Sequence, residues 1–294
     1  MFNYKNLLQI HANSLDGKTV ALTGATGGIG NYVCDYLAAL GADIICLDRN
    51  ADKSNKLIAK LKAKYPTLNA NHITVNLENF DNVRDVADKL KAVGIDYLIL
   101  NAGAYKIPRY KCDTGFDNVF QINFISQYYL ARELMPIIKS QGGRVVAVSS
   151  IAHNYSKINA DDIDFSNVSA SSKVYGNAKR FLTFSLYGLF DNDKTLSMAH
   201  PGITLTNITA HYPKLIFAVI KHPMKIIFMH PKKAALSIIC AVFNGCSSNE
   251  WIGPKYFNIW GMPKKKKLHT CKADEALQIC NLTEQIYLKL KTNS

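Results

Sequence analysis

The sequence lacks the features that mark membrane-spanning, disulfide-bonded and disordered proteins. No apolar run is long enough to cross a bilayer, and 48% hydrophobic with 19% charged residues is the composition of a globular chain. The seven cysteines are an odd number, lie far apart and form no Cys-x-x-Cys pair. The first residues show no basic stretch followed by a clean apolar one, unlike a signal peptide. These absences favour reduced thiols and a cytoplasmic protein.

Acidic residues are scarce in one part of the chain. The net charge is +13, and the segment from Thr206 to Ala273 holds eleven lysines and one acid, Glu250, so it supplies +10 of that charge. A basic balance can indicate a nucleic-acid partner, but no basic recognition helix or aromatic platform accompanies it here. The eight histidines show no metal-ligand spacing. We therefore expect neither a nucleic-acid partner nor a metal site.

Short apolar runs alternate with stretches of helical periodicity along most of the chain. The runs with the length of buried strands are 18–23, 42–48, 72–77, 95–100, 143–150 and 195–200. Helical patterns separate them, and the longest covers about 116–139. Strands that alternate with helices predict a parallel sheet covered on both faces. We therefore expect a single α/β domain over 1–294, a doubly wound Rossmann-type sheet with a less regular segment at about 205–273.

A glycine-rich turn joins the first strand to the first helix. Its candidate cofactor-binding residues are Thr23, Gly24, Thr26, Gly27, Gly28, Ile29 and Gly30. Because glycines carry no side chain, backbone N–H groups and the helix N-terminus can approach a pyrophosphate there. A plain tight turn is the alternative, but the strand–turn–helix context favours dinucleotide binding.

Asp48 and Arg49 end the second strand, where a Rossmann-type fold places the side chain that reads the cofactor ribose. A carboxylate there accepts hydrogen bonds from both ribose hydroxyls and repels a 2′-phosphate, which favours NAD. Arg49 could instead accommodate that phosphate, so NADP remains the alternative cofactor.

Tyr175 and Lys179 lie one turn apart on a predicted helix and so share one face of it. Alone, the pair is a weak pattern, but other motifs accompany it in order: LNAGA at 100–104, Asn123 in FQINF, Ser149-Ser150, and HPGITLT at 200–206. Together with the glycine turn, this series resembles the classical type of the short-chain dehydrogenase/reductase family over about residues 17–210. The stretches DTGFDNVFQIN, SSIAH and HPG most resemble its retinol-dehydrogenase-like branch.

The resemblance assigns the catalytic work to Asn123, Ser150, Tyr175 and Lys179. Tyr175 would exchange a proton with a carbonyl or alcohol, while Ser150 would hold the substrate oxygen by a hydrogen bond. Lys179 would favour the phenolate and bind the nicotinamide ribose, and Asn123 would anchor a water in a proton relay. The further cofactor contacts that it implies are Asn76, Leu77, Asn101, Ala102, Gly103, Pro201, Gly202, Ile203 and Thr206.

The implied activity is hydride transfer between NAD or NADP and the carbonyl, or the primary or secondary alcohol, of a small apolar substrate. A homodimer or homotetramer, built on the long helix and its neighbour, is implied as well. Two alternatives stay open. The spacing Gly24-x-x-Gly27-x-x-Gly30 also occurs in extended-type enzymes that modify nucleotide sugars. A dinucleotide-binding sensor without turnover is the other, although such proteins usually lose the Tyr or the Lys.

The basic segment invites two interpretations. Residues 214–230 interleave lysines with large apolar side chains, are interrupted by Pro223, and are too charged to span a membrane. A substrate lid at about 205–233 with solvated lysines is the simpler interpretation. Alternatively, the lid together with Lys264–Lys267 and Trp260 rests on an anionic membrane surface, which makes the protein peripheral to the membrane.

Overall fold

The computed structural model describes residues 14–191, 193–204, 229–268 and 271–292. Their centre is one eight-stranded sheet of order β3-β2-β1-β4-β5-β6-β7-β8. All neighbouring strands are parallel except β7 and β8, which pair antiparallel as a hairpin at the sheet edge. The strands are β1 (Thr19–Thr23), β2 (Asp43–Asp48), β3 (Ala70–Thr74), β4 (Tyr97–Leu100), β5 (Arg144–Val148), β6 (Leu196–Ala199), β7 (Glu250–Tyr256) and β8 (Trp260–Lys267).

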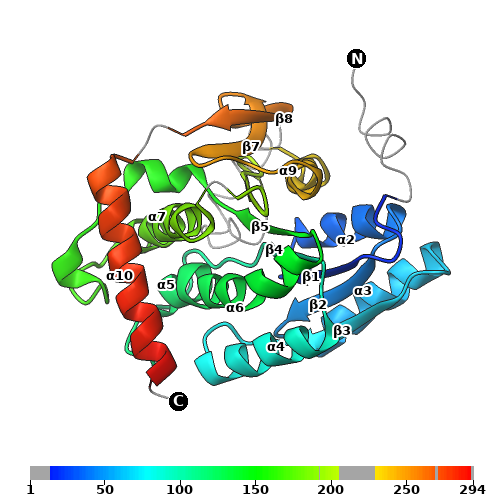
Figure 1. The fold of residues 1–294 in the computed structure, drawn as a ribbon, viewed down its shortest axis with the longest axis horizontal. Coiled ribbons are helices and arrows are strands. Elements are labelled where there is room, and N and C mark those ends of the chain that lie inside the picture. The colour runs from blue at the N-terminus through cyan, green and yellow to red at the C-terminus, as the bar shows by residue number, and fades with distance from the viewer. Residues whose placement is uncertain (1–13, 192, 205–228, 269–270, 293–294) are drawn as a thin grey trace, which may run out of the picture.

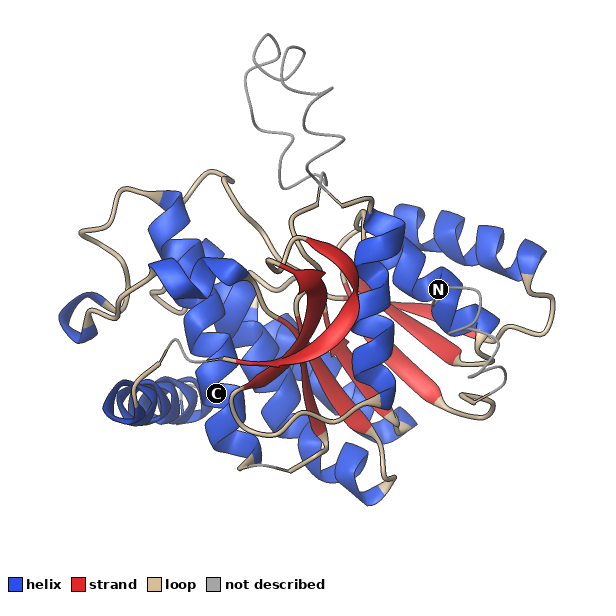
Figure 2. Cartoon of the chain, turned by 90° about the horizontal axis from the view of Figure 1, so that it is seen from above, coloured by secondary structure: helices blue, strands red, loops and turns tan. Residues whose placement is uncertain are grey.

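Helices cover both faces of this sheet (Figures 1 and 2). One face carries α2 (Gly30–Ala39), α3 (Ala51–Lys64) and α9 (Pro231–Phe243), whose buried side chains share one apolar core. The opposite face carries α4 (Phe80–Val93), α5 (Asn118–Phe120), α6 (Ser126–Ser140) and α7 (Ser171–Phe190), with a second core. The predicted doubly wound parallel sheet is therefore confirmed.

Local sequence explains where several helices begin and end. The Asn50 side chain accepts a hydrogen bond from the backbone N–H of Lys53 at the start of α3, and Asn79 caps α4 in the same way. Gly94 ends α4 with a φ of +74°, a value that glycine adopts without strain. Pro231 opens α9, where a missing N–H leaves no bond unmade.

The last helix, α10 (Ala273–Thr292), lies outside the second helical layer against α7 (Figure 1). Its buried residues pack over Phe124, Tyr128 and Tyr129 of the long helical segment. Arg180 of α7 forms a two-pronged ion pair with Glu275 of α10, with nitrogen–oxygen distances of 2.8 and 2.5 Å. The chain's own α10 therefore covers the aromatic face on which an oligomer was expected, and the homodimer or homotetramer stays a prediction.

The expectation of an irregular segment at 205–273 is wrong where the structure describes it. Residues 229–268 hold α9 and the β7–β8 hairpin. The pattern hid them because α9 is apolar on most of its surface, while β8, WGMPKKKK, is an edge strand. Lysines and prolines are common on such edges, where they oppose pairing with another chain. Most of the predicted lid, 205–228, lies outside the described residues.

Among the described residues, no helix is both long enough and apolar enough to cross a membrane.

Candidate active site

The strand order reverses between β1 and β4, and a cavity lies beyond the carboxyl ends of these strands. The cavity has a volume of about 370 Å³. Its lining combines the turn after β1, the end of β2, the segment after β3 and the segment after β4: Gly24, Thr26–Gly30, Leu47–Arg49, Val75–Glu78, Asn101–Ala104, Ile107 and Ile122. It does not include Ser150, Tyr175 or Lys179.

The glycine turn is too tight for side chains. Gly24 has a φ of +70°, and a Cβ there would lie 2.9 Å from the Cα of Ala102. A Cβ on Gly30 would overlap the carbonyl oxygen of Gly24. The backbone N–H groups of the turn therefore border the cavity without side chains in between, next to the first turn of α2.

Thr23 and Asn101 hold the ends of β1 and β4 together. The Thr23 hydroxyl oxygen accepts hydrogen bonds from the backbone N–H groups of Asn101 and Ala102, each at 3.0 Å. The Asn101 amide donates to the carbonyl oxygens of Thr23 and Gly24 at 3.0 and 3.1 Å. Thr23 itself is fully buried, so it shapes the site from beneath the turn, whereas Asn101, Ala102 and Gly103 line the cavity.

Asp48 and Arg49 have different surroundings. The Asp48 carboxylate is buried and accepts hydrogen bonds from Thr26, through its N–H at 3.2 Å and its hydroxyl at 2.9 Å, and from the Ser54 hydroxyl at 3.0 Å. The Arg49 guanidinium, with 73% of its side chain exposed, pairs instead with Glu78 at 3.0 Å. Asp48 is thus fixed at the cavity wall, and the charge of Arg49 is balanced by a neighbouring carboxylate that lines the same cavity.

The structure brings together Ser150 and Tyr175, which the sequence predicts as catalytic residues. Ser150 follows the end of β5, and Tyr175 lies in the first two turns of α7. Burial raises the pKa of the Tyr175 phenol to about 12, although its hydrogen bond with Ser150 acts in the opposite direction. The ring of Tyr105 lies against Tyr175, with centroids 5.1 Å apart, and its charge when ionised would raise the pKa further. At neutral pH this tyrosine is a protonated acid.

Lys179 lies one turn along α7 from Tyr175. It is 3% exposed, and its Nζ donates a hydrogen bond of 2.9 Å to the carbonyl oxygen of Val148. The Nζ is 5.9 Å from the centre of the Tyr175 ring. Burial lowers the pKa of Lys179 to about 8, because a buried ammonium loses its hydration. This lysine therefore changes charge close to physiological pH.

Asn123 lies in a single turn of π-helix, Gln121–Ile125, between α5 and α6. Such turns are often found at functional sites. Its amide donates to the carbonyl oxygens of Ala104 and Val119 at 2.8 and 2.7 Å and accepts from the Ala104 N–H at 3.2 Å. A Cβ on Gly103 would lie 2.8 Å from the Asn123 side-chain oxygen. Asn123 thus fixes the segment after β4, and its role in anchoring water stays a prediction.

The loop after β6 is partly described. Gly202 has a φ of +82°, and the Ile203 carbonyl oxygen accepts from the N–H of Met229 at 2.8 Å. Pro201 is buried, and the preceding residue, His200, donates its backbone N–H to the carbonyl oxygen of Ile252 in β7 at 2.8 Å. Thr206, the last predicted cofactor contact, lies outside the described residues.

Several residues of the site carried no recognisable pattern in the sequence. Tyr105 follows LNAGA directly, but only the fold brings its ring to Tyr175. Ser54 and Glu78 approach Asp48 and Arg49 from α3 and from the segment after β3. An alternation of charge or a fixed spacing would not have found them, because each contact joins separate elements.

Comparison with known proteins shows similarity to short-chain dehydrogenases. A family model described as short chain dehydrogenase matches residues 18–161. Human polyprenol dehydrogenase is 27% identical over 207 residues, which are 66% of this chain and 63% of that protein, so the chain spans less than two thirds of it. Mouse retinol dehydrogenase 14 is 27% identical over 90% of this chain and 83% of its own length. The WW domain-containing oxidoreductase of Drosophila melanogaster is 26% identical over 96% and 71%.

Solved structures share the fold. An uncharacterised protein from Mycobacterium paratuberculosis superposes with a TM-score of 0.73 at 23% identity, over 92% of this chain and 93% of its own. L-Sorbose reductase from Gluconobacter frateurii, solved with NADPH and L-sorbose, gives a TM-score of 0.59 at 18% identity, over 79% and 90%.

Proposed function

The chain belongs to the short-chain dehydrogenase/reductase family, and we propose that it transfers a hydride between NAD(H) and the carbonyl or alcohol group of an apolar substrate. The contact between Ser150 and Tyr175, with Lys179 buried one turn away, is the observation that carries this proposal. NAD or NADP is the cofactor type of the family, and the nicotinamide ring supplies the hydride chemistry when bound. The protein supplies orientation, charge and a proton.

The cavity has the features that a dinucleotide needs. Its glycine turn presents backbone N–H groups beside the first turn of α2, which suits a pyrophosphate. At the end of β2, the Asp48 carboxylate accepts three hydrogen bonds, from the Thr26 N–H, the Thr26 hydroxyl and the Ser54 hydroxyl, which leaves about one of its four acceptor sites for a ribose hydroxyl. Val75, Asn76 and Leu77 line the wall on the side of β3, and Asn76 and Leu77 are among the cofactor contacts that the family resemblance implies.

A preference for NAD over NADP follows from the charges beside Asp48. A 2′-phosphate would have to approach the buried Asp48 carboxylate and would meet Glu78 next to it. Arg49 is the one cation at this end of the described cavity lining, and it already pairs with Glu78. A 2′-phosphate would thus meet two carboxylates, Asp48 and Glu78, and a single cation, Arg49, that already pairs with Glu78. This balance of charge favours NAD.

Tyr175 would act as the acid in carbonyl reduction. Its phenol keeps its proton at neutral pH, since the pKa is raised to about 12, so it can donate to a carbonyl oxygen held by Ser150. In alcohol oxidation the same phenol must first lose its proton. The positive charge of a bound oxidised nicotinamide and that of a protonated Lys179 would both favour the phenolate. The pKa of Tyr175 should therefore fall when the oxidised cofactor binds.

An apolar substrate is the part of the proposal that rests on relatives and on one aromatic contact. Polyprenol and retinol, which give two relatives their names, are both apolar alcohols. The Tyr105 ring beside Tyr175 offers an apolar surface to the group next to a reacting carbonyl.

The test is turnover measured by absorbance in the NADH band, with a panel of ketones, aldehydes and primary and secondary alcohols that includes long-chain and isoprenoid compounds. We expect NADH-dependent reduction of apolar carbonyls, and faster oxidation of the matching alcohols as the pH rises. Tight cofactor binding without turnover over the whole panel would favour the alternative of a dinucleotide-binding sensor. Turnover of nucleotide sugars alone would favour the extended-type enzyme.

A further inference from the structure

The turn of the β7–β8 hairpin carries large aromatic side chains into solvent. Phe257 is 82% exposed, Tyr256 is 53% exposed and Trp260 is 39% exposed. Tyr256 and Trp260 are directly paired across the hairpin, and Phe257 lies in the turn between them. Exposing this much aromatic surface is unfavourable in water, and a cluster of this kind is typical of an interaction site.

The hairpin holds these side chains in a backbone conformation that is unusual for Phe. Phe257 and Asn258 have φ values of +52° and +57°, and the Ile259 N–H donates to the Tyr256 carbonyl oxygen at 2.9 Å. This is the geometry of a tight hairpin turn in which Asn-Gly is the preferred pair. A bulky residue with positive φ is rare, and such strain is found most often where it serves a function. The turn therefore presents the Phe257 side chain to solvent.

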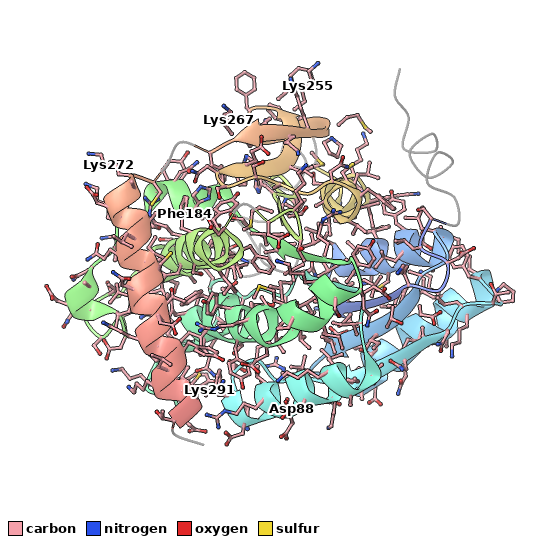
Figure 3. The ribbon with its side chains drawn as sticks, in the orientation of Figure 1. Asp88, Phe184, Lys255, Lys267, Lys272 and Lys291 are labelled. Atoms are coloured by element: carbon pink, nitrogen blue, oxygen red, sulfur yellow. The ribbon has the colours of Figure 1, made fainter. Side chains whose placement is uncertain are left out.

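The hairpin that carries the aromatic turn is rich in lysine, and its acid, Glu250, lies at the end of the hairpin opposite the turn, 3.7 Å from Lys265. Residues 254–267 contain five lysines and no Asp or Glu. Four of them, Lys255, Lys264, Lys265 and Lys267, are exposed. Figure 3 shows Lys255 and Lys267 pointing away from the body of the protein. The fifth, Lys266, lies inside the hairpin, where it donates to the side-chain oxygen of Asn258 at 2.8 Å and to the Pro254 carbonyl oxygen.

The hairpin is attached firmly to the loop that contains Pro201 and Gly202. The ring of His200 stacks on Trp251 of β7 at a centroid distance of 4.7 Å and donates through Nε2 to the Asn258 carbonyl oxygen at 3.0 Å. A Cβ on Gly202 would lie 3.1 Å from the Ile259 carbonyl oxygen. The aromatic turn is thus held next to the loop that contains the predicted cofactor contacts Pro201 and Gly202.

We propose that the β7–β8 turn is a membrane-docking surface, which binds the headgroup region of an anionic lipid bilayer through Tyr256, Phe257 and Trp260. The exposed lysines would lie over the lipid phosphates, and the aromatic rings would enter the interface, where Trp and Tyr are most favourable. Charge complementarity favours this partner over a protein, since residues 254–267 combine exposed aromatic side chains with positive charge alone.

The choice of lysine also favours lipid over nucleic acid. The chain contains no arginine after Arg180, so the hairpin lacks the planar, two-pronged donor that nucleic-acid sites commonly use for phosphates. Lysine acts as a point charge, and a diffuse anionic surface requires no more than that. On the basis of the proposed function, this orientation would also bring an apolar substrate from the bilayer to the loop beside the active site.

Sedimentation of the full chain with lipid vesicles tests the proposal. We expect binding to phosphatidylcholine vesicles that contain about 30% phosphatidylserine, weak binding to pure phosphatidylcholine, and loss of binding as salt shortens the screening length. Trp260 gives a second readout, because the only other tryptophan, Trp251, is 1% exposed. Its fluorescence should shift to the blue when vesicles that contain phosphatidylserine are added.

Two variants of the hairpin separate its aromatic and its basic contribution. Phe257→Ser with Tyr256→Ser should abolish the blue shift and most of the binding. Lys255→Gln, Lys264→Gln and Lys267→Gln together should weaken the partition coefficient about a hundredfold, at about fivefold for each lysine. The matched control, Lys56→Gln, Lys60→Gln and Lys62→Gln on the exposed face of α3, removes the same charge far from the hairpin (Figure 1) and should cost much less.

Three outcomes would overturn the proposal. They are equal loss of binding in the α3 control, full binding by both hairpin variants, and binding to RNA that competes with the vesicles and needs the same hairpin residues. Turnover of a water-soluble ketone is measured in parallel and should stay unchanged in the hairpin variants. If turnover is absent in the wild type while vesicle binding behaves as expected, the proposed function fails and the docking surface stands.

Discussion

Replacing Lys179 with Met should destroy the activity, and the stability of the variant relative to the wild type should be more favourable at neutral pH than at high pH. Lys179 is 3% exposed, and burial lowers its pKa from 10.5 to about 8. The folded protein therefore binds fewer protons than the unfolded chain between about pH 8 and 10.5, and wild-type stability gains from this group as the pH rises through that window. Below it the buried ammonium costs free energy, and Met carries no such cost.

The size of this stability effect follows from the difference between the pKa of Lys179 in the unfolded chain and in the folded protein. A difference of about 2.5 units, from 10.5 to about 8, corresponds to about 3 kcal/mol. Met also leaves the Val148 carbonyl oxygen without the hydrogen bond from Nζ, which costs about 1–3 kcal/mol at every pH because neutral lysine donates as well. Because the cost of this lost hydrogen bond is the same at every pH, it cancels when the stability differences at two pH values are compared. The stability of the variant minus that of the wild type should thus be about 3 kcal/mol more favourable near pH 7 than near pH 10.5.

Urea unfolding of both proteins without cofactor, across this range of pH, measures that difference. Other tyrosines and cysteines titrate there too, but they are common to both proteins and drop out. A free-energy difference that stays constant with pH would refute the argument, because it would mean that Lys179 keeps an ordinary pKa in the folded state. Cofactor titration of the same samples should show weaker NADH binding by Lys179→Met, since the ribose loses its ammonium donor.

Three further changes probe other parts of the account. Asp48→Ala should weaken NADH binding about 10- to 100-fold, as expected for the loss of hydrogen bonds to a carboxylate, and should narrow or reverse the preference over NADPH. Fluorescence titration with both cofactors measures it, and an unchanged ratio of affinities would be inconsistent with Asp48 as the ribose contact. Tyr105→Leu should shift the pH profile of alcohol oxidation downward, because the ionised Tyr105 raises the pKa of Tyr175; an upward shift would argue against this contact. Arg180→Gln should destabilise the fold by about 2–3 kcal/mol in urea, since it leaves Glu275 and the His153 carbonyl oxygen unpaired. The control Lys111→Gln, in a pair with Asp164 that is exposed on both sides, should change stability by less than about 1 kcal/mol, and equal effects would contradict the role of α10.

Local sequence was sufficient to predict the strands and turns that position the site. Each strand is a short apolar run that ends in a distinctive residue or turn, and β1, β2, β4, β5 and β6 lie within a few residues of their predicted bounds. β3 was displaced. It covers Ala70–Thr74, and the predicted end of the strand, Val75–Leu77, leaves the sheet to line the cavity. An apolar run does not show where a chain turns from pairing with a strand to bordering a ligand.

Contacts between separate elements could not be predicted in this way. The sequence makes Arg49 a candidate residue for binding the 2′-phosphate of NADP, but its ion pair with Glu78 forms only in the folded protein. Tyr105 meets Tyr175 across two elements that lie far apart in the chain. α10 covers the aromatic face of the long helix with its own buried apolar side chains, and the ion pairs Arg180–Glu275 and Arg132–Glu284 join it to α7 and α6. Contacts of this kind form only when separate elements pack together, so the periodicity of a single segment cannot predict them.

The central claim is that Tyr175 exchanges the proton while the rest of the site holds the cofactor. Tyr175→Phe removes the hydroxyl and keeps the ring, including its contact with Tyr105. Turnover with the best substrate of the panel and NADH affinity should be measured on the same preparation. The account predicts a loss of kcat of at least about 100-fold, the usual contribution of a positioned acid, with the NADH dissociation constant nearly unchanged. Near-wild-type turnover by Tyr175→Phe would contradict it.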